Sequence, residues 1–149
     1  MATRIQVTID CADPDRLARF WAEALGYRLQ EPPDGFDSWQ AYWASRGLPP
    51  EEVEDGYDAI VDPDGVGPRI WFQPVPEGKV VKNRLHLDLD LDVGGGRGAP
   101  LAARRERVNA EADRLVAAGA TRFRVLSEEA VDHYGVVMQD PEGNEFCLH

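Results

Sequence analysis

Two stretches of the chain alternate apolar and polar residues with the two-residue period of a β-strand. Residues 5–10 and residues 84–91 carry isoleucine, valine or leucine at every second position. A strand with this pattern turns one face to the core and the other to solvent or to a site. Gln6 in the first stretch and His86 in the second occupy equivalent positions on the polar face.

An amphipathic helix that ends at a glycine is predicted after each of these strands. The first covers residues 16–25, with Asp13 as its N-cap, Pro14 in its first turn and Gly26 after its end. The second covers residues 100–118 and ends at Gly119. The expected buried stripes are Leu17, Phe20, Trp21, Ala24 and Leu25 in the first helix, and Leu101, Val108, Ala112, Leu115 and Val116 in the second.

Three further strands are predicted after each helix, and a turn with the pattern Asp-Pro-acidic-Gly precedes the last of them. The two halves therefore repeat the order strand, helix and three strands, with a module boundary at Pro74, Pro76 and Gly78. We expect one domain over residues 1–149, made of module one (1–78) and module two (79–149). The six strands are predicted at residues 27–30, 57–61, 69–73, 121–126, 134–139 and 144–148.

Residues 36–56 form an insertion that belongs to the first half alone. Phe36, Trp39, Tyr42 and Trp43 recur at roughly helical spacing, which predicts a short helix over residues 38–46. Large aromatic side chains usually pack, so we prefer the interpretation that they cover the edge of a core. The alternative is a lid that contacts a ligand.

Length and charge narrow the possible functions. At 149 residues and 43% hydrophobic, the chain supports one sizeable core that the two halves share. Sixteen basic against 27 acidic residues give a net charge of -11, which repels nucleic acid and anionic membrane surfaces. We therefore expect neither as a partner.

Targeting signals and cysteine pairs are not evident either. The first residues lack the apolar segment of a signal peptide, and no run of about 18 apolar residues occurs, so a cytoplasmic protein is expected. Cys11 and Cys147 lack CxxC spacing, and we interpret them as buried thiols rather than as a disulfide or a zinc site.

Several segments together resemble the vicinal oxygen chelate superfamily, in particular its glyoxalase-like, bleomycin-resistance-like branch. They are residues 6–27, 70–77, 82–89 and 114–120, and Asp-Pro-Glu-Gly-Asn-Glu-Phe-Cys-Leu at residues 140–148. The resemblance implies an α+β fold in which two βαβββ modules form curved mixed sheets around a shared concave cleft. It also implies that homodimers are common, and we expect one here.

The resemblance further implies a divalent metal held by four side chains, one from the first and one from the last strand of each module. The corresponding positions are Gln6, Trp71, His86 and Cys147. Tryptophan cannot bind a metal. A shift of two residues gives Gln6, Gln73, His86 and His149, which includes no carboxylate to balance the charge of the ion. A site of Gln6, His86 and Glu145 is a further alternative.

We therefore prefer a small-molecule-binding protein without the standard metal site, although a divalent metal is possible at the incomplete set Gln6 and His86. An aromatic ligand would stack on Trp71, and the negative charge favours cationic ligands. The alternative is a divalent-metal-dependent lyase, isomerase or dioxygenase, with Glu145 as the catalytic base. The expected ligand-binding residues are Gln6, Thr8, Trp71, Gln73, His86, Asp88 and Cys147.

Overall fold

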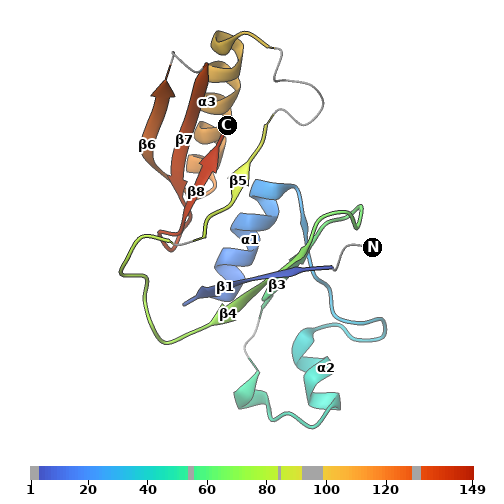
Figure 1. Cartoon of the computed structure of the whole chain (residues 1–149). Helices are drawn as coiled ribbons and strands as arrows, with labels where there is room; N and C mark the ends of the chain where they lie inside the picture. The colour runs from blue at the N-terminus through green and yellow to red at the C-terminus, as the bar shows by residue number, and fades with distance from the viewer. Residues whose placement is uncertain (1–3, 54–55, 84, 92–98, 129–131) are drawn as a thin grey trace. The chain divides into compact units, whose positions relative to one another are not determined.

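The computed structural model of the chain describes residues 4–53, 56–83, 85–91, 99–128 and 132–149. The chain divides into two compact units, residues 1–78 and residues 79–149. Each unit contains a four-stranded mixed sheet with a helix packed on one face (Figure 1). The expected α+β fold of two βαβββ units is thus confirmed.

In the first unit the strands lie in the order β1-β4-β3-β2. The strand β1 pairs in parallel with β4, whereas β3 pairs antiparallel with both β4 and β2. The parallel pair places Gln6 beside Arg69 and Thr8 beside Trp71. The strands are β1 (Gln6–Cys11), β2 (Arg28–Leu29), β3 (Ala59–Val61) and β4 (Arg69–Pro74).

The helix α1 (Pro14–Leu25) begins and ends as its sequence predicts. The side chain of Asp13 accepts a hydrogen bond from the backbone N–H of Arg16 at 3.0 Å, and Gly26 ends the helix with a φ of 67°. The helix packs on β3 and β4. Its buried residues Leu17, Phe20 and Trp21 share the core of this unit with Ile60, Ile70 and Phe72.

Asp15, in the first turn of α1, ties the helix to the segment that leads into β3. Its Oδ1 accepts the backbone N–H of Tyr57 at 2.9 Å, and the guanidinium of Arg19 donates to its Oδ2 at 2.8 Å. The hydrogen bond from Arg19, together with that from Tyr57, holds the pKa of the Asp15 carboxyl below its ordinary value of 3.8, against the opposing effect of burial.

Replacing Asp15 with asparagine is therefore expected to lower the melting temperature at about pH 7, where the wild-type carboxylate is ionised. A depressed folded-state pKa stabilises the protein above 3.8, and this stabilisation is lost as the pH falls through the folded-state value. The difference in melting temperature between wild type and Asp15→Asn should shrink towards zero in acid. A constant difference across the pH series would show that ionisation of Asp15 contributes nothing.

The second unit repeats the topology with the strand order β5-β8-β7-β6. Here β5 pairs in parallel with β8, and β7 pairs antiparallel with β8 and β6. The helix α3 (Leu101–Ala117) buries Val108, Ala112 and Leu115. The core side of the sheet supplies Val136, Met138, Phe146 and Leu148. The strands are β5 (Asp88–Leu89), β6 (Thr121–Glu128), β7 (His133–Gln139) and β8 (Glu145–Leu148).

The stripe of α3 differs from the prediction at two positions, since Leu101 is only half-buried and Val116 is exposed. Val116 has 44% of its surface exposed, whereas its neighbour Leu115 is fully buried. The two residues are about 100° apart around the helix axis, so the narrow sheet covers only one of them. Val116 therefore does not belong to the core.

The strand predicted over residues 84–91 is shorter in the structure. Only β5 (Asp88–Leu89) is strand, Arg84 lies outside the described residues, and Leu85 is 88% exposed. Two backbone hydrogen bonds extend the pairing of this segment with β8 and the residue that follows β8. The carbonyl of Leu87 accepts from the N–H of Cys147, and the N–H of Leu91 donates to the carbonyl of His149, both at 2.9 Å. This strand lies at the edge of its sheet, and among the described strands it pairs with β8 alone.

Both turns with the Asp-Pro-acidic-Gly pattern fold around the aspartate. The carboxylate of Asp62 accepts the backbone N–H groups of residues 64, 66 and 67. The carboxylate of Asp140 accepts those of Glu142 and Asn144, both at 2.9 Å, and also the side-chain amide of Asn144. The glycine of each turn adopts a positive φ, as the chain reversal requires.

The remaining expectations concern the cysteines and the membrane. No disulfide joins Cys11 to Cys147; the first is buried as expected, whereas the second is half-buried. Within the described ranges, none of the helices has the length and apolar character needed to cross a bilayer.

Candidate functional site

The predicted site residues lie on the sheet faces that the helices α1 and α3 leave open. In the first unit the strand register places Thr8 beside Trp71 on this face, with Gln6 and Gln73 two positions away on their own strands. In the second unit Asp88 lies beside Cys147. Two groups of side chains result, one in each unit.

A pocket of about 590 Å³ lies in the first unit. One part of its wall comes from the sheet and includes Gln6, Arg69 and Trp71. The rest comes largely from the aromatic insertion, where Trp39 and Trp43 belong to the helix α2 (Trp39–Ser45). Ser38 caps this helix by accepting the backbone N–H of Ala41 at 3.1 Å, and a 3-10 turn (Pro50–Glu52) follows.

The aromatic side chains of the insertion pack on one another rather than into the core. Trp39 and Trp43 are stacked with ring centroids 6.2 Å apart, and the ring of Tyr42 contacts both of them. No residue of α2 is buried, and Trp43 is 38% exposed. The aromatic residues of α2 therefore do not belong to the core, and their contact with a ligand stays a prediction.

Polar groups of the pocket are held in place by hydrogen bonds. Arg69 donates to the amide oxygens of Gln30 at 2.7 Å and of Gln6 at 2.8 Å. The indole N–H of Trp71 donates to Asp58 at 2.9 Å, which fixes the orientation of its ring. Gln6 is therefore oriented by Arg69, a partner that the sequence did not indicate because it lies 63 positions away.

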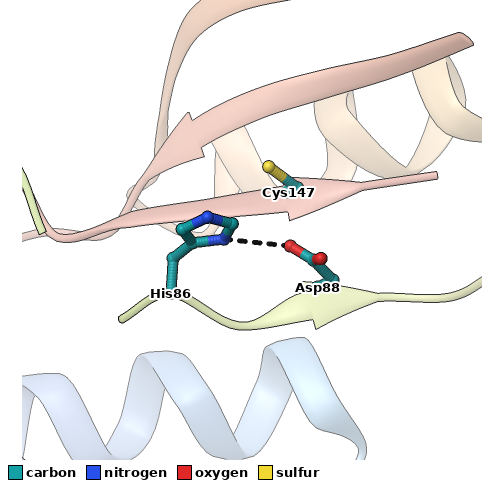
Figure 2. Close-up of side chains that lie close together, drawn as sticks. All are labelled: His86, Asp88 and Cys147. Carbon is teal, nitrogen blue, oxygen red and sulfur yellow. Dashed lines mark hydrogen bonds and ion pairs between the residues drawn. The ribbon is translucent and has the colours of Figure 1, made fainter. Parts of the chain in front are cut away.

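The second group consists of His86, Asp88 and Cys147. Figure 2 shows His86 and Asp88 on the segment of β5 and Cys147 on the adjacent β8. The Nδ1 atom of His86 lies 3.0 Å from Oδ1 of Asp88. One ligand atom of each side chain lies within 4.8 Å of the other two. The sequence predicted Asp88 only as a ligand-binding residue, although a spacing of two on a strand places it on the same face as His86.

The environment of Cys147 keeps its thiol protonated. Burial is the main cause that raises the pKa of the thiol, and the carboxylate of Asp88 raises it further. Since the thiolate is the nucleophilic form, Cys147 is a poor nucleophile in this environment.

Glu145, the predicted base, lies on the face of the same sheet that α3 does not cover. Only 8% of its surface is nevertheless exposed. Lys82 donates to its carboxylate at 2.5 Å, and this hydrogen bond is the main cause that lowers the pKa of the carboxyl. The backbone N–H of Glu145 in turn donates to the side chain of Asn83. A carboxylate stabilised in this way is a weaker base than a free one, and a catalytic role for Glu145 stays a prediction.

The four positions that the family resemblance assigns to a metal do not fit a hard divalent ion. The indole of Trp71 offers only an N–H, which Asp58 already accepts, and the amide oxygen of Gln6 accepts from Arg69. Cys147 stands where a carboxylate is usual, so the set contains no hard anionic ligand.

Several solved structures share this fold at low sequence identity, which shows the fold alone. Hypothetical protein SA1046 from S. aureus has a TM-score of 0.60 at 13% identity, with 99% of this chain and 93% of that chain covered. A mutant of the fosfomycin resistance protein FosX from Listeria monocytogenes, complexed with Mn(II) and 1S,2S-dihydroxypropylphosphonic acid, has a TM-score of 0.60 at 11% identity, with 100% and 90% covered. A glyoxalase/bleomycin resistance protein/dioxygenase family enzyme from Burkholderia phytofirmans PsJN has a TM-score of 0.55 at 18% identity, with 96% and 94% covered.

The family of the chain is identified by comparison of its sequence with models of protein families. No curated protein matches the chain. A model of the glyoxalase-like domain, in contrast, matches residues 6–149, which is nearly the whole length. The chain belongs to the glyoxalase-like domain family.

Proposed function

We propose that this protein binds a planar aromatic small molecule with a positive charge in the pocket of its first unit. The observation that carries the proposal is the tryptophan lining: Trp39, Trp43 and Trp71 all border a space of about 590 Å³. Pockets for small molecules typically measure about 300–1,000 Å³ and are lined by apolar and aromatic side chains. The pocket is therefore large enough for one drug-sized molecule.

The orientation of the rings supports a flat ligand. Trp71 lies on the sheet with its indole N–H bonded to Asp58, and Trp39 is held by a hydrogen bond of 2.9 Å to the backbone oxygen of Gln30. Two indoles that are fixed before binding lose little conformational freedom when a ligand stacks on them. Leu48 adds an aliphatic surface to the same lining.

The charges of the pocket support a cationic ligand. Its lining includes the acidic residues Asp15, Glu52 and Asp58 and one basic residue, Arg69. Indole faces attract cations by about 0.5–2 kcal/mol, depending on how far the site is desolvated. The net charge of -11 also raises the local concentration of cations around the protein.

Acridine orange, a planar aromatic cation, and 1-pyrenesulfonate, a planar anion, test this proposal. We expect saturable quenching of tryptophan fluorescence by the cation and at least about tenfold weaker binding of the anion, which corresponds to ~1.4 kcal/mol. Trp71→Ala should weaken binding of the cation by about tenfold or more, because a stacking surface is lost. Calorimetry provides an affinity that does not depend on the mutated fluorophore.

Phe123→Ala is a matched control, because this aromatic side chain is 55% exposed and belongs to the second unit. It should leave the affinity for acridine orange unchanged. Equal affinity for the cation and the anion, or an unchanged affinity in Trp71→Ala, would refute the proposal.

A metal-dependent lyase, isomerase or dioxygenase is the second candidate. It is favoured by the three converging ligand groups of the second unit and by the Mn(II) of the FosX complex. A fold shared by several chemistries does not choose among them. Addition of EDTA separates the two candidates, since it would abolish a metal-dependent reaction and leave acridine orange binding unchanged.

A further inference from the structure

We infer that the ligand of the pocket in the first unit carries two charges: it is an aromatic cation with an additional carboxylate, which Arg69 binds. The inference rests on the proposed function and narrows it to a class of ligand. Arg69 borders the same pocket as Trp71 and precedes it by two residues on β4, so both side chains lie on the open face of the sheet. A ligand that stacks on Trp71 therefore lies within reach of the guanidinium.

The partners of the Arg69 guanidinium are neutral amides. Its Nε donates to the side-chain oxygen of Gln30 at 2.7 Å, and its Nη1 donates to that of Gln6 at 2.8 Å. Among the described residues, no carboxylate forms an ion pair with Arg69. A guanidinium has five N–H groups, so two are used here and three can donate to a ligand.

Other arginines of the chain differ from Arg69 in this respect. Arg19 forms an ion pair with Asp15 at 2.8 Å. Arg114 forms one with Glu111 at 2.6 Å. Carboxylates are the abundant partners in a chain with 27 acidic and 16 basic residues. The two amides instead fix the orientation of the Arg69 guanidinium and leave its charge uncompensated, an arrangement suited to binding a planar anionic group.

The charges on the sheet wall of the pocket are separated along β4. The carbonyl of Asp58 accepts the backbone N–H of Phe72 at 2.7 Å, and its carboxylate accepts the indole N–H of Trp71 at 2.9 Å. Arg69 lies three residues before Phe72, which corresponds to about 10 Å along a strand. A ring that stacks on Trp71 therefore meets Asp58 towards one end and Arg69 towards the other.

This separation determines which ligand gains most. The positive part of a ligand is attracted by Asp58 and repelled by Arg69, so the group that reaches Arg69 is neutral or anionic. A carboxylate there forms charge-assisted hydrogen bonds, which are roughly twice as strong as neutral ones. Because the lining also contains the acidic residues Asp15 and Glu52, an aromatic anion without a positive charge stays disfavoured. The favoured ligand carries both charges.

Tetramethylrhodamine and its methyl ester test the inference, because both contain the planar cation and only the acid contains a carboxylate. We expect fluorescence anisotropy at about pH 7 to show that the wild-type protein binds the acid about tenfold more tightly than the ester, which corresponds to ~1.4 kcal/mol. This comparison uses the unaltered chain and needs no variant that folds.

Arg69→Gln should remove this preference. The affinity for tetramethylrhodamine should fall about tenfold, whereas the affinity for the ester should stay the same or rise, because a repelling charge is lost. A purely structural role of Arg69 would instead change both affinities by the same factor. Arg114→Gln is the matched control, because it removes the same group from α3 in the second unit and should leave both affinities unchanged. Circular dichroism establishes that each variant is folded.

The outcomes distinguish this inference from the proposed function. If acridine orange binds but tetramethylrhodamine binds no more tightly than its ester, the inference is overturned and the proposed function stands. If none of the three dyes binds, both are overturned. A preference for the acid that persists in a folded Arg69→Gln variant would also overturn the inference, because another group would then hold the carboxylate.

Discussion

Replacing Phe72 with alanine is expected to lower the free energy of unfolding of the first unit by about 3–5 kcal/mol. Phe72 is completely buried on the side of β4 that faces α1, in the core that contains Leu17 and Ile60. Truncation removes the free energy of transferring the ring from water and leaves a cavity that the surrounding side chains fill only in part. Urea denaturation followed by circular dichroism measures the loss.

The neighbouring residue provides the matched control for this prediction. Trp71 precedes Phe72 on β4 but points to the open face, where it is only half-buried and borders the pocket. Trp71→Ala should therefore lower the free energy of unfolding clearly less than Phe72→Ala does. It should weaken the binding of the proposed ligand instead. If both variants lost the same free energy of unfolding, the assignment of the two faces of β4 would be wrong.

Asp140→Ala is expected to destabilise the second unit by about 2–3 kcal/mol, because buried hydrogen bonds to a charged group are lost. Asp140 is 3% exposed, and its carboxylate accepts the backbone N–H groups of Glu142 and Asn144 at 2.9 Å. When alanine replaces Asp140, these two N–H groups stay in a partly buried turn, and the alanine side chain offers them no acceptor. Urea denaturation of the full chain would show the earlier transition.

Asp140→Asn is the control for this second prediction. Asparagine keeps one side-chain oxygen at the position of the acceptor Oδ1, and it removes the charge. It should cost less free energy of unfolding than alanine. Equal losses in the two variants would mean that the backbone hydrogen bonds of the turn contribute no stability.

The sequence predicted best those elements that short-range chemistry determines. The helix α1 lies between Asp13 and Gly26 as expected, and its cap is a bond between residues three positions apart. The turn at Asp140 likewise depends on bonds that span four residues or fewer. Such features need no knowledge of the rest of the fold.

Predictions that depended on what covers a residue were less accurate. The alternation of residues 84–91 indicated a long strand, but β5 covers two residues and Leu85 is 88% exposed. The apolar spacing of residues 36–43 is the same whether α2 packs on a core or borders a pocket. Only the structure shows that Trp39 and Trp43 line the pocket.

The sequence predicted the candidate site only in part, because it does not show which distant residues become partners. The period of the strands predicts that Gln6 and Trp71 lie on the open face of the first sheet and that His86 lies on the open face of the second, but it does not predict their partners. Gln6 accepts from Arg69, which is 63 positions away, and Asp88 meets Cys147 through the register of two distant strands. Long-range pairs of this kind are set by tertiary packing and leave no local pattern.

The parallel pairing of β1 with β4 has a consequence for the order in which the first unit can form. The ribosome makes β1 first, but the strand that pairs with it in the described sheet begins 63 residues later, at Arg69. Contacts this distant close late, because the entropy of the intervening loop must be overcome first. Gln6 therefore acquires its place in the pocket only after β4 has left the ribosome. The side of the pocket that β1 forms is therefore synthesised first but completed last.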